Sequence, residues 1–390
     1  MTKTPFSFPL PGVRGLVCAG VMLGIFGALE AKAQEPVRDA AMPYYTAADM
    51  LQSLYGKYLP ERAEGFVSAS KLQERALAGF CSGAETNAGA LRTQWRQTHA
   101  AWLALSTPNI GPLVVRRSLR QIDFTPIRSQ LIERAVRKAP QTAADMELIG
   151  TPAKGFGALD WLLHQGLKPS TAECAFALQV AKAITVEAAA LASDFKTLES
   201  RRWNEGSEEG GETSGRLGAT AEETGSAMAE WVNQWLGGVE RLRWIEMEKP
   251  IKTVEGTDKP ASFARMAMAD NLLEWQAQWQ SLLMHALLTP AQRQLPPVPG
   301  KDLISIEALL LTKGHIALSL RWRDALGAVT MQLNEITKEA GGVHGPQAGD
   351  RANERILALA ARLKAITVMF QSDIAPALDI PLGFNDTDGD

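Results

Sequence analysis

The sequence predicts an all-α fold. Ala and Leu, both good helix formers, dominate its long segments, whereas only 4 Tyr and 12 Phe occur among the 390 residues. Apolar residues recur at helical spacing, Pro and Gly fall between the apolar segments, and no convincing strand-like alternation appears. Apolar residues make up 46% of the chain and charged residues 21%, which favours a packed core over disorder.

Residues 1–33 have the pattern of a secretory signal peptide. Lys3 and Arg14 supply positive charge, residues 15–29 are apolar, and Ala31-Lys32-Ala33 predicts cleavage after Ala33, so that Gln34 begins the mature chain. The apolar run is shorter than the roughly 20 residues that a spanning helix needs, although an uncleaved anchor stays an alternative. We therefore expect a periplasmic or secreted protein, with no transmembrane segment once the signal is removed.

Long segments of the mature chain show helical periodicity. The first apolar stripe combines Leu91, Trp95, Trp102 and Leu105. Residues 172–198 are Ala-rich and contain neither Gly nor Pro, which predicts one extended helix. The last stripe consists of Ile356, Leu359, Leu363, Ile366 and Phe370.

A change of composition predicts two domains. Residues 204–225 are rich in Gly, Glu, Ser and Thr and contain almost no large apolar side chains, so they are expected to form a linker or a mobile insertion. This segment separates an N-terminal helical bundle, residues 34–203, from a C-terminal helical bundle, residues 226–390. Several long helices joined by short breaks in each half suit an up-and-down bundle.

Cysteine and charge content narrow the class of protein further. Without the signal, Cys81 and Cys174 remain, and an even count in an oxidising compartment predicts a disulfide between them. Two buried thiols or a metal pair are the alternative. The net charge is −3 and no basic block occurs, so nucleic acid is not an expected partner.

The stretch from Gly155 to His164 contains candidate metal ligands. Gly155 permits backbone torsions that other residues resist, and an apolar helical segment follows it. Asp160 and His164 lie four residues apart, so they share one face of a helix and could ligate Zn²⁺ or an iron ion. Alternatively, Asp160 is a carboxylate favoured by the helix dipole near the N-terminus, and His164 is an ordinary histidine.

Other polar residues are less specific. The histidines His99, His285, His315 and His344 are scattered and are not expected to be ligands. Arg116, Arg117 and Arg120 could line an anion-facing cleft or form a solvated helix face. The sequence contains no His-Glu-x-x-His motif, no Gly-x-Ser-x-Gly elbow and no phosphate-binding glycine loop with Lys.

The stretch 155–164 resembles the signature of the imelysin family, which reads Gly-x-His-x-x-Glu before an apolar run. Further similarity lies in Trp95 to Trp102, Gly111-Pro112, residues 122–132 and the ending 382–390, and it covers nearly the whole mature chain. Imelysins are bacterial envelope proteins linked to iron uptake or described as peptidases. The resemblance implies an all-α fold with two bundle-like domains.

The resemblance also identifies motif positions. The signature glycine is Gly155, its histidine position is occupied by Gly157, and its glutamate position by Asp160. Since the histidine and glutamate are the family's proposed metal ligands, one ligand is missing. We therefore expect an exported, non-catalytic binding or accessory component of bacterial iron uptake, with iron-uptake components of the envelope as partners and iron or another divalent metal as the possible cofactor. The alternatives are an exported metallopeptidase and a helical partner-binding module without metal.

Overall fold

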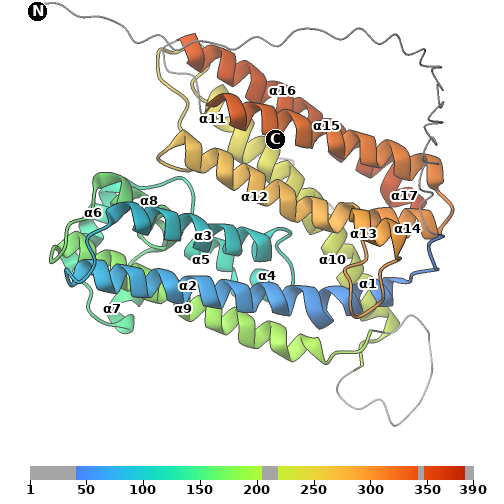
Figure 1. Cartoon of the computed structure of the whole chain (residues 1–390), viewed down its shortest axis with the longest axis horizontal. Helices are drawn as coiled ribbons and strands as arrows, with labels where there is room; N and C mark the ends of the chain where they lie inside the picture. Colours follow the sequence, from blue (N-terminus) through green and yellow to red (C-terminus); the bar gives the residue numbers. More distant parts are fainter. Residues whose placement is uncertain (1–40, 204–217, 341–346, 383–390) are drawn as a thin grey trace, which may run out of the picture. The chain divides into compact units, whose positions relative to one another are not determined.

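The computed structural model describes residues 41–203, 218–340 and 347–382. All the secondary-structure elements of three or more residues in these ranges are helices (Figure 1). The all-α prediction is therefore confirmed. The predicted signal peptide with its Ala33/Gln34 cleavage site, most of the predicted linker, His344 and nearly all of the acidic ending lie outside the described residues.

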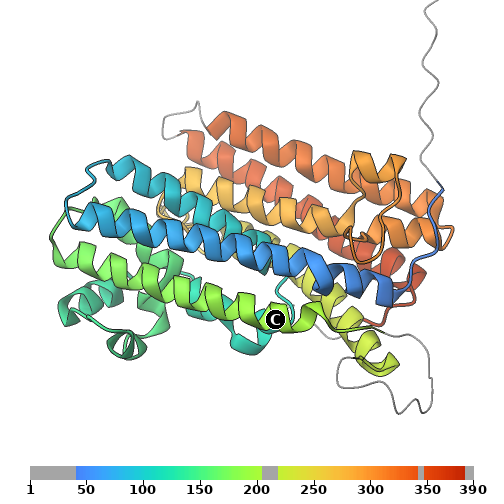
Figure 2. The same ribbon diagram turned by 60° about the horizontal axis from the view of Figure 1, so that its bottom comes forward.

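The first part of the chain is organised around four helical runs. α1 (Ala47–Ser53), the π-helical turn η1 (Leu54–Tyr58) and α2 (Leu59–Cys81) follow one another directly, and α3 (Ala88–Ser106), α8 (Gly155–Gln165) and α9 (Ala172–Glu199) pack beside them. α2 and α9 run side by side (Figures 1 and 2). Between α3 and α8 lie the short helices α4 (Pro112–Arg116), α5 (Ser118–Ile122), α6 (Ser129–Lys138), α7 (Ala143–Glu147) and η2 (Thr151–Ala153).

The second part is built from four long helices and several short ones. The long helices are α10 (Ala221–Glu240), α12 (Met268–Ala286), α15 (Ile316–Ala340) and α16 (Gln347–Met369). The short ones are η3 (Arg241–Glu248), α11 (Lys249–Lys252), α13 (Pro290–Gln294), α14 (Ile306–Thr312), η4 (Phe370–Ile374) and α17 (Ala375–Ala377). α10 begins inside the predicted 204–225 linker, because Thr220 and Glu223 form a capping box that starts the helix there.

Buried tryptophans hold the helices together. Both predicted stripes are buried, as expected, and seven indole rings are less than 2% exposed: Trp95, Trp102, Trp231, Trp235, Trp275, Trp279 and Trp322. Six of these donate their indole N–H to a partner on another element, for example Trp95 to the carbonyl of Phe156. Each of these six rings thus combines a large apolar area with a satisfied polar group, whereas the indole N–H of Trp275 has no hydrogen-bond partner among the described residues.

Helices α3 and α12 bring the two parts of the chain together (Figure 1). Asp270, in the first turn of α12, lies 2.6 Å from the Nε of Arg96 and 3.4 Å from Nη2 of Arg92, both on α3. Residues 40–390 form one compact unit, and the predicted division into two bundles at 204–225 stays a prediction.

Helix α9 is the one described helix that is long and apolar enough to cross a membrane by length and composition. Half of its most apolar window is buried inside the protein, along α2. It also carries Glu187, which accepts hydrogen bonds from Arg116 and Ser118. These contacts are those of a core helix in a bundle.

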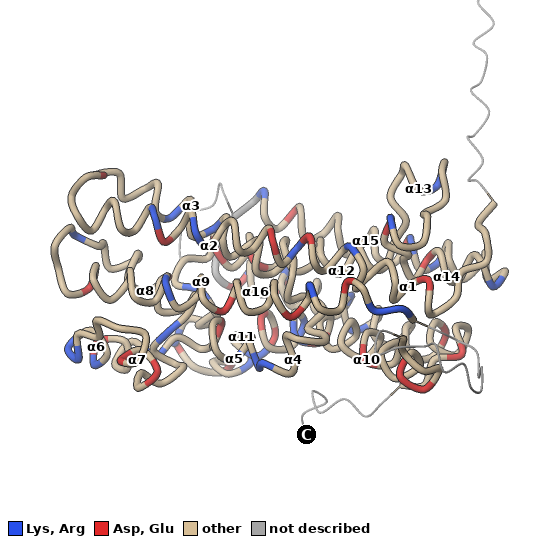
Figure 3. Tube along the Cα trace, turned by 90° about the horizontal axis from the view of Figure 1, so that it is seen from below, with Lys and Arg blue, Asp and Glu red and all other residues tan. Residues whose placement is uncertain are grey.

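Lys and Arg and also Asp and Glu are distributed over the described helices, with both signs present across the molecule (Figure 3). Many of these charges are paired, as in the contact of Lys313 with Asp379. The interspersed signs agree with the absence of a basic block in the sequence.

The predicted disulfide is present and joins Cys81, at the end of α2, to Cys174, in the first turn of α9. It closes a loop with a sequence separation of 93 residues. A covalent link between α2 and α9 reduces the conformational entropy of the unfolded chain, whereas it hardly changes that of the folded state, in which the two helices already pack together. The disulfide also indicates an oxidising compartment.

We expect the double variant Cys81→Ala/Cys174→Ala to lose about 4 kcal/mol of unfolding free energy, because a loop of this length removes that much chain entropy from the unfolded state. Urea denaturation measures the loss. Wild-type protein in reductant should unfold at the urea concentration that unfolds the variant. A variant as stable as the oxidised wild type would contradict the assigned contribution.

Candidate functional site

Two glycines of the motif helix α8 are explained by close packing. Gly155 has a φ of +73°, and a Cβ there would lie 2.2 Å from the carbonyl oxygen of Ile122, so no other residue fits. A Cβ at Gly157 would lie 3.3 Å from both the Phe124 carbonyl oxygen and the Ile127 Cγ1. A side chain at Gly157 would need these neighbours to give way by a few tenths of an ångström, and the glycine itself offers no ligand atom. The residues present do not fit the metal site that the family signature implies.

Asp160 is fully buried and its two carboxylate oxygens already have donors. Oδ1 accepts a 2.6 Å hydrogen bond from Nη1 of Arg92, and Oδ2 accepts one of 2.8 Å from the backbone N–H of Met266. His164, near the end of the same helix, is exposed. The structure therefore does not bring Asp160 and His164 together in one site, because the aspartate faces the protein interior and the histidine faces solvent.

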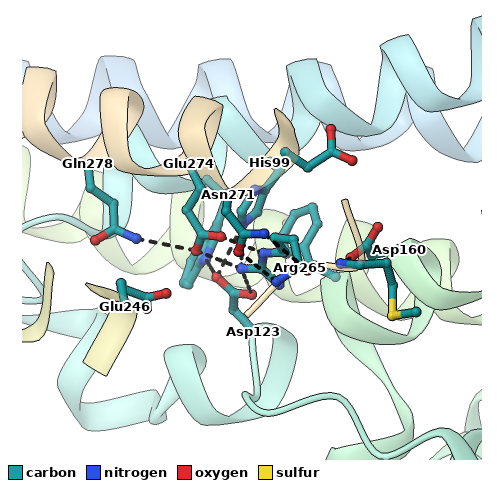
Figure 4. A network of polar contacts seen from close by, with 12 residues as sticks. His99, Asp123, Asp160, Glu246, Arg265, Asn271, Glu274 and Gln278 are labelled. Carbon is teal, nitrogen blue, oxygen red and sulfur yellow. Dashed lines mark hydrogen bonds and ion pairs between the residues drawn. The ribbon is translucent and has the colours of Figure 1, made fainter. Parts of the chain in front are cut away.

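The bond from Met266 to Asp160 fixes the loop that precedes α12. Asn271 secures the same loop from the other side: its Oδ1 accepts from the backbone N–H of Arg265, and its Nδ2 donates to the Arg265 carbonyl. With the backbone held at Arg265 and Met266, the Arg265 side chain points into the interior between His99 on α3 and Glu274 on α12 (Figure 4). The motif carboxylate thus acts as a positioning residue for Arg265.

Arg265 is the centre of a buried polar network (Figure 4). Its side chain is 0% exposed. Its Nη2 donates to Asp123 at 2.7 Å and to His99 at 2.9 Å, while Nε and Nη2 donate to the two oxygens of Glu274 at 2.6 and 2.8 Å. Short, charge-assisted hydrogen bonds of this kind are among the strongest in proteins.

Without Arg265, the three acceptors would resemble a metal site. Ligand atoms of His99, Asp123 and Glu274 lie within 4.8 Å of one another, and among the described residues they form the one group of three that could hold a metal ion. The guanidinium of Arg265 bonds to all three. Since a guanidinium can only donate, we assign His99 the neutral form that accepts at Nε2 and carries its proton on Nδ1.

Burial and the Arg265 charge oppose each other in setting the pKa values of the network. Burial alone would raise the pKa of Asp123, but the charge of Arg265 outweighs it and holds the pKa below its ordinary value. Burial likewise disfavours the charged form of Arg265, yet Asp123 and Glu274 raise its pKa well above the ordinary value. The opposite charges therefore keep one another ionised, as expected for buried ions that are paired and hydrogen-bonded.

A further acid, Glu246, lies beside this network. Its Oε1 is 3.3 Å from Nε of Arg241, and its buried Oε2 has no hydrogen-bond partner among the described residues. Burial and the charge of Glu274 raise the pKa of Glu246 to about 7, against the lowering effects of Arg241 and Arg265. Glu246 therefore changes its charge near neutral pH.

We expect Glu246→Gln to leave stability nearly unchanged at pH 5 and to increase it at pH 8. The folded protein holds the Glu246 proton more tightly than the unfolded chain does, so this group's contribution to stability falls as pH rises from about 4.5 to about 7. Glutamine imitates the protonated acid at every pH. Urea denaturation at both pH values measures the difference, and the exposed Glu255→Gln is the control. Equal stability of wild type and Glu246→Gln at pH 8 would contradict the raised pKa.

A pocket of about 430 Å³ opens against the network. Asp123, Arg241 and Gln278 belong to its wall, and Gln278 also donates to Glu274. The pocket lies between the end of α3, the end of α5, the α10–η3 junction and α12. Its volume falls in the range of small-molecule sites, and π-helical turns such as η3 are frequent at functional sites.

Sequence reasoning missed the network. His99 was expected to be a core or surface residue without a ligand role, and in the structure it is 3% exposed and its ring stacks on Trp95, with centroids 5.1 Å apart. Its spacing from Trp95 and Trp102 already placed it on the buried stripe, which was the available signal. The partners Asp123, Arg265 and Glu274 are distant in sequence and carry no local motif.

The three arginines that were predicted to line a cleft or to form a solvated helix face have different roles. Arg116 pairs with Glu187 at 2.8 Å and with Asp194 at 3.3 Å. Arg117 is exposed, and Arg120 lines the pocket beside the network. Of the three arginines, Arg120 is therefore the one that lines a cleft.

Comparison with known proteins adds the family to this picture. The fold and the site define an all-helical protein with a buried, arginine-centred acidic network beside a pocket. The chain belongs to the imelysin family, whose family model matches residues 61–367. The sequence matches none of the curated proteins.

Two solved structures share the fold. An imelysin-like protein from Psychrobacter arcticum 273-4 has 17% sequence identity and a TM-score of 0.62, with 88% of this chain and 100% of that chain covered. A "putative iron-regulated protein A precursor" from Parabacteroides distasonis ATCC 8503 has 12% identity and a TM-score of 0.54, with 85% of this chain and 98% of that chain covered.

Proposed function

We propose that this imelysin-family protein is an exported, non-catalytic binding or accessory component of bacterial iron uptake. The observation that carries the non-catalytic part is the position of Arg265. A metallopeptidase needs a metal ion that holds and activates a water molecule. Here a guanidinium, which neither binds nor activates water in this way, bonds to His99, Asp123 and Glu274.

The motif positions support the same proposal. Gly157 offers no ligand, and Asp160 uses both oxygens to hold Arg92 and the backbone of Met266. The carboxylate of the signature thus has a structural task in this chain. A protein whose buried acceptors already bond to an internal cation is better suited to binding than to hydrolysis.

Export and the link to iron have separate support. The signal-like segment 1–33 and the disulfide between Cys81 and Cys174 favour the periplasm or secretion. The link to iron comes from the family and from the name of the Parabacteroides distasonis protein, an iron-regulated protein precursor. Envelope components of iron uptake are the proposed partners.

Peptidase activity is tested by incubating the purified protein with insulin chains and Zn²⁺, with and without a chelator. Thermolysin serves as the positive control. We expect no chelator-sensitive cleavage. Cleavage that the chelator abolishes would instead establish the metallopeptidase alternative.

The iron role is tested in the host bacterium by deleting the gene and growing cells under iron limitation. We expect slower growth than wild type, restored by the intact gene and by added iron. Equal growth of deletion and wild type would favour the partner-binding module without a metal role.

A further inference from the structure

The pocket beside the Arg265 network has an unequal distribution of charge. Three charged residues line it: Asp123, Arg120 and Arg241. The charge of Asp123 is already matched, because Oδ1 accepts from Arg265 and Oδ2 accepts from the indole N–H of Trp102 at 3.0 Å. Arg241 is partly matched by Glu246, whose Oε1 lies 3.3 Å from its Nε, so Arg120 is the pocket charge that has no ion pair in the described part of the chain.

Both pocket arginines have free donor capacity. Arg120 is exposed and makes no ion pair among the described residues. Arg241 uses Nε for Glu246, and its two terminal nitrogens make no ion pair within the described part of the chain. A planar guanidinium matches the two oxygens of a carboxylate, so this pair favours an anionic ligand with carboxylate groups.

Asn109 adds an acceptor to the same pocket. Its Oδ1 is buried and has no hydrogen-bond partner among the described residues. A buried acceptor without a donor costs free energy, and a ligand hydroxyl group reaches this oxygen once the Asn109 side chain turns toward the pocket, where the new hydrogen bond offsets that cost. Leu103, Leu119 and Phe124 supply apolar wall around these polar groups.

We propose that this pocket binds a small hydroxypolycarboxylate. Carboxylates of the ligand bond to Arg120 and Arg241, and its hydroxyl donates to Asn109. The pocket volume of about 430 Å³ accommodates a molecule of this size. Hydroxypolycarboxylates also chelate Fe³⁺ through oxygen atoms, and a link to iron through such a chelate rests on the proposed function.

Two ligands that differ by a single group provide the first test. Citrate and tricarballylate share three carboxylates, but only citrate has the hydroxyl. By titration calorimetry on the mature protein without iron, we expect citrate to bind about fivefold more tightly, the equivalent of one hydrogen bond. No binding of citrate, or equal affinity for both ligands, would overturn the proposal. Equally tight binding of inorganic phosphate would also overturn it, since it would indicate a site for any small oxyanion.

Variants test the residues. Arg120→Gln should weaken binding of both ligands at least about threefold, as loss of one partly exposed charge contact implies. Arg117→Gln, an exposed neighbour outside the pocket, is the matched control and should bind citrate as wild type does. Asn109→Leu should remove the difference between citrate and tricarballylate. Unchanged affinity in Arg120→Gln would overturn the proposal, and because Arg120 is exposed its replacement leaves the core intact.

The outcomes separate this inference from the proposed function. The titrations contain no iron, so citrate binding can be observed even if gene deletion leaves growth under iron limitation unchanged. Conversely, a growth defect in the deletion strain together with no citrate binding would retain the iron role and reject this ligand.

Discussion

Replacing Arg265 with methionine should lower the unfolding free energy by about 3–5 kcal/mol, the usual cost of removing one partner from a buried ion pair. The variant leaves the carboxylates of Asp123 and Glu274 close together in the interior without their cation. Methionine is similar in length to arginine and adds no polar group. The decrease in unfolding free energy therefore reports mainly on the removal of the positive charge. Urea denaturation at pH 7 measures it.

Arg321→Met is the matched control for this experiment. Arg321 pairs with Asp373 at 2.7 Å, but its side chain is 63% exposed, so its loss should cost less than about 1 kcal/mol. If Arg265→Met were no more destabilising than Arg321→Met, the buried network would not have the central role assigned to it.

The second large effect is expected for Gly155→Ala. A left-handed backbone costs a non-glycine residue about 1–2 kcal/mol, and here the new Cβ would also meet the Ile122 carbonyl oxygen at 2.2 Å. Relief of that contact requires α8 to move away from α5, which would disturb the packing of Phe156. We expect a loss of more than about 3 kcal/mol, measured by urea denaturation.

Gly166→Ala is a control that separates the cost of the left-handed backbone from the cost of the steric contact. The φ of Gly166 is +81°, close to that of Gly155, but a Cβ there would have no atom within 4 Å. Gly166→Ala should therefore cost only the torsional part, about 1–2 kcal/mol. Equal losses in the two variants would show that the close approach to Ile122 does not explain the motif glycine.

The helices and the disulfide could be predicted from sequence because their signals are local. The buried stripes follow from residue spacing within one helix, as for Trp95 and Trp102, and the two cysteines that follow the predicted signal peptide leave one intramolecular pairing. Gly155 was recognised by the same kind of local argument. The steric reason for it, the Ile122 carbonyl, needed the structure.

The candidate site could not be predicted because its members are brought together by tertiary packing. His99 and Arg265 are 166 residues apart in sequence, and Arg265 lies in a loop without any motif. The resemblance correctly gave the family and fold. It directed attention to Asp160 as a ligand, whereas in the structure this carboxylate positions the loop that carries the internal cation.

In this chain, the parts of the signature that remain have structural tasks. The glycine of the motif serves close packing and the acid serves loop placement, and neither task requires a metal. The motif can therefore persist as a structural element after its histidine is lost. Predicting metal chemistry from such a chain requires a check for a cation such as Arg265 in the neighbouring interior.

The most direct test of the account is anomalous diffraction from crystals of the protein without residues 1–33, soaked in Mn²⁺ or Zn²⁺. We expect no anomalous peak among His99, Asp123 and Glu274, with the Arg265 guanidinium in place and bonded to all three. A peak coordinated by these residues, with Arg265 displaced, would contradict the claim that the protein supplies its own cation at this site.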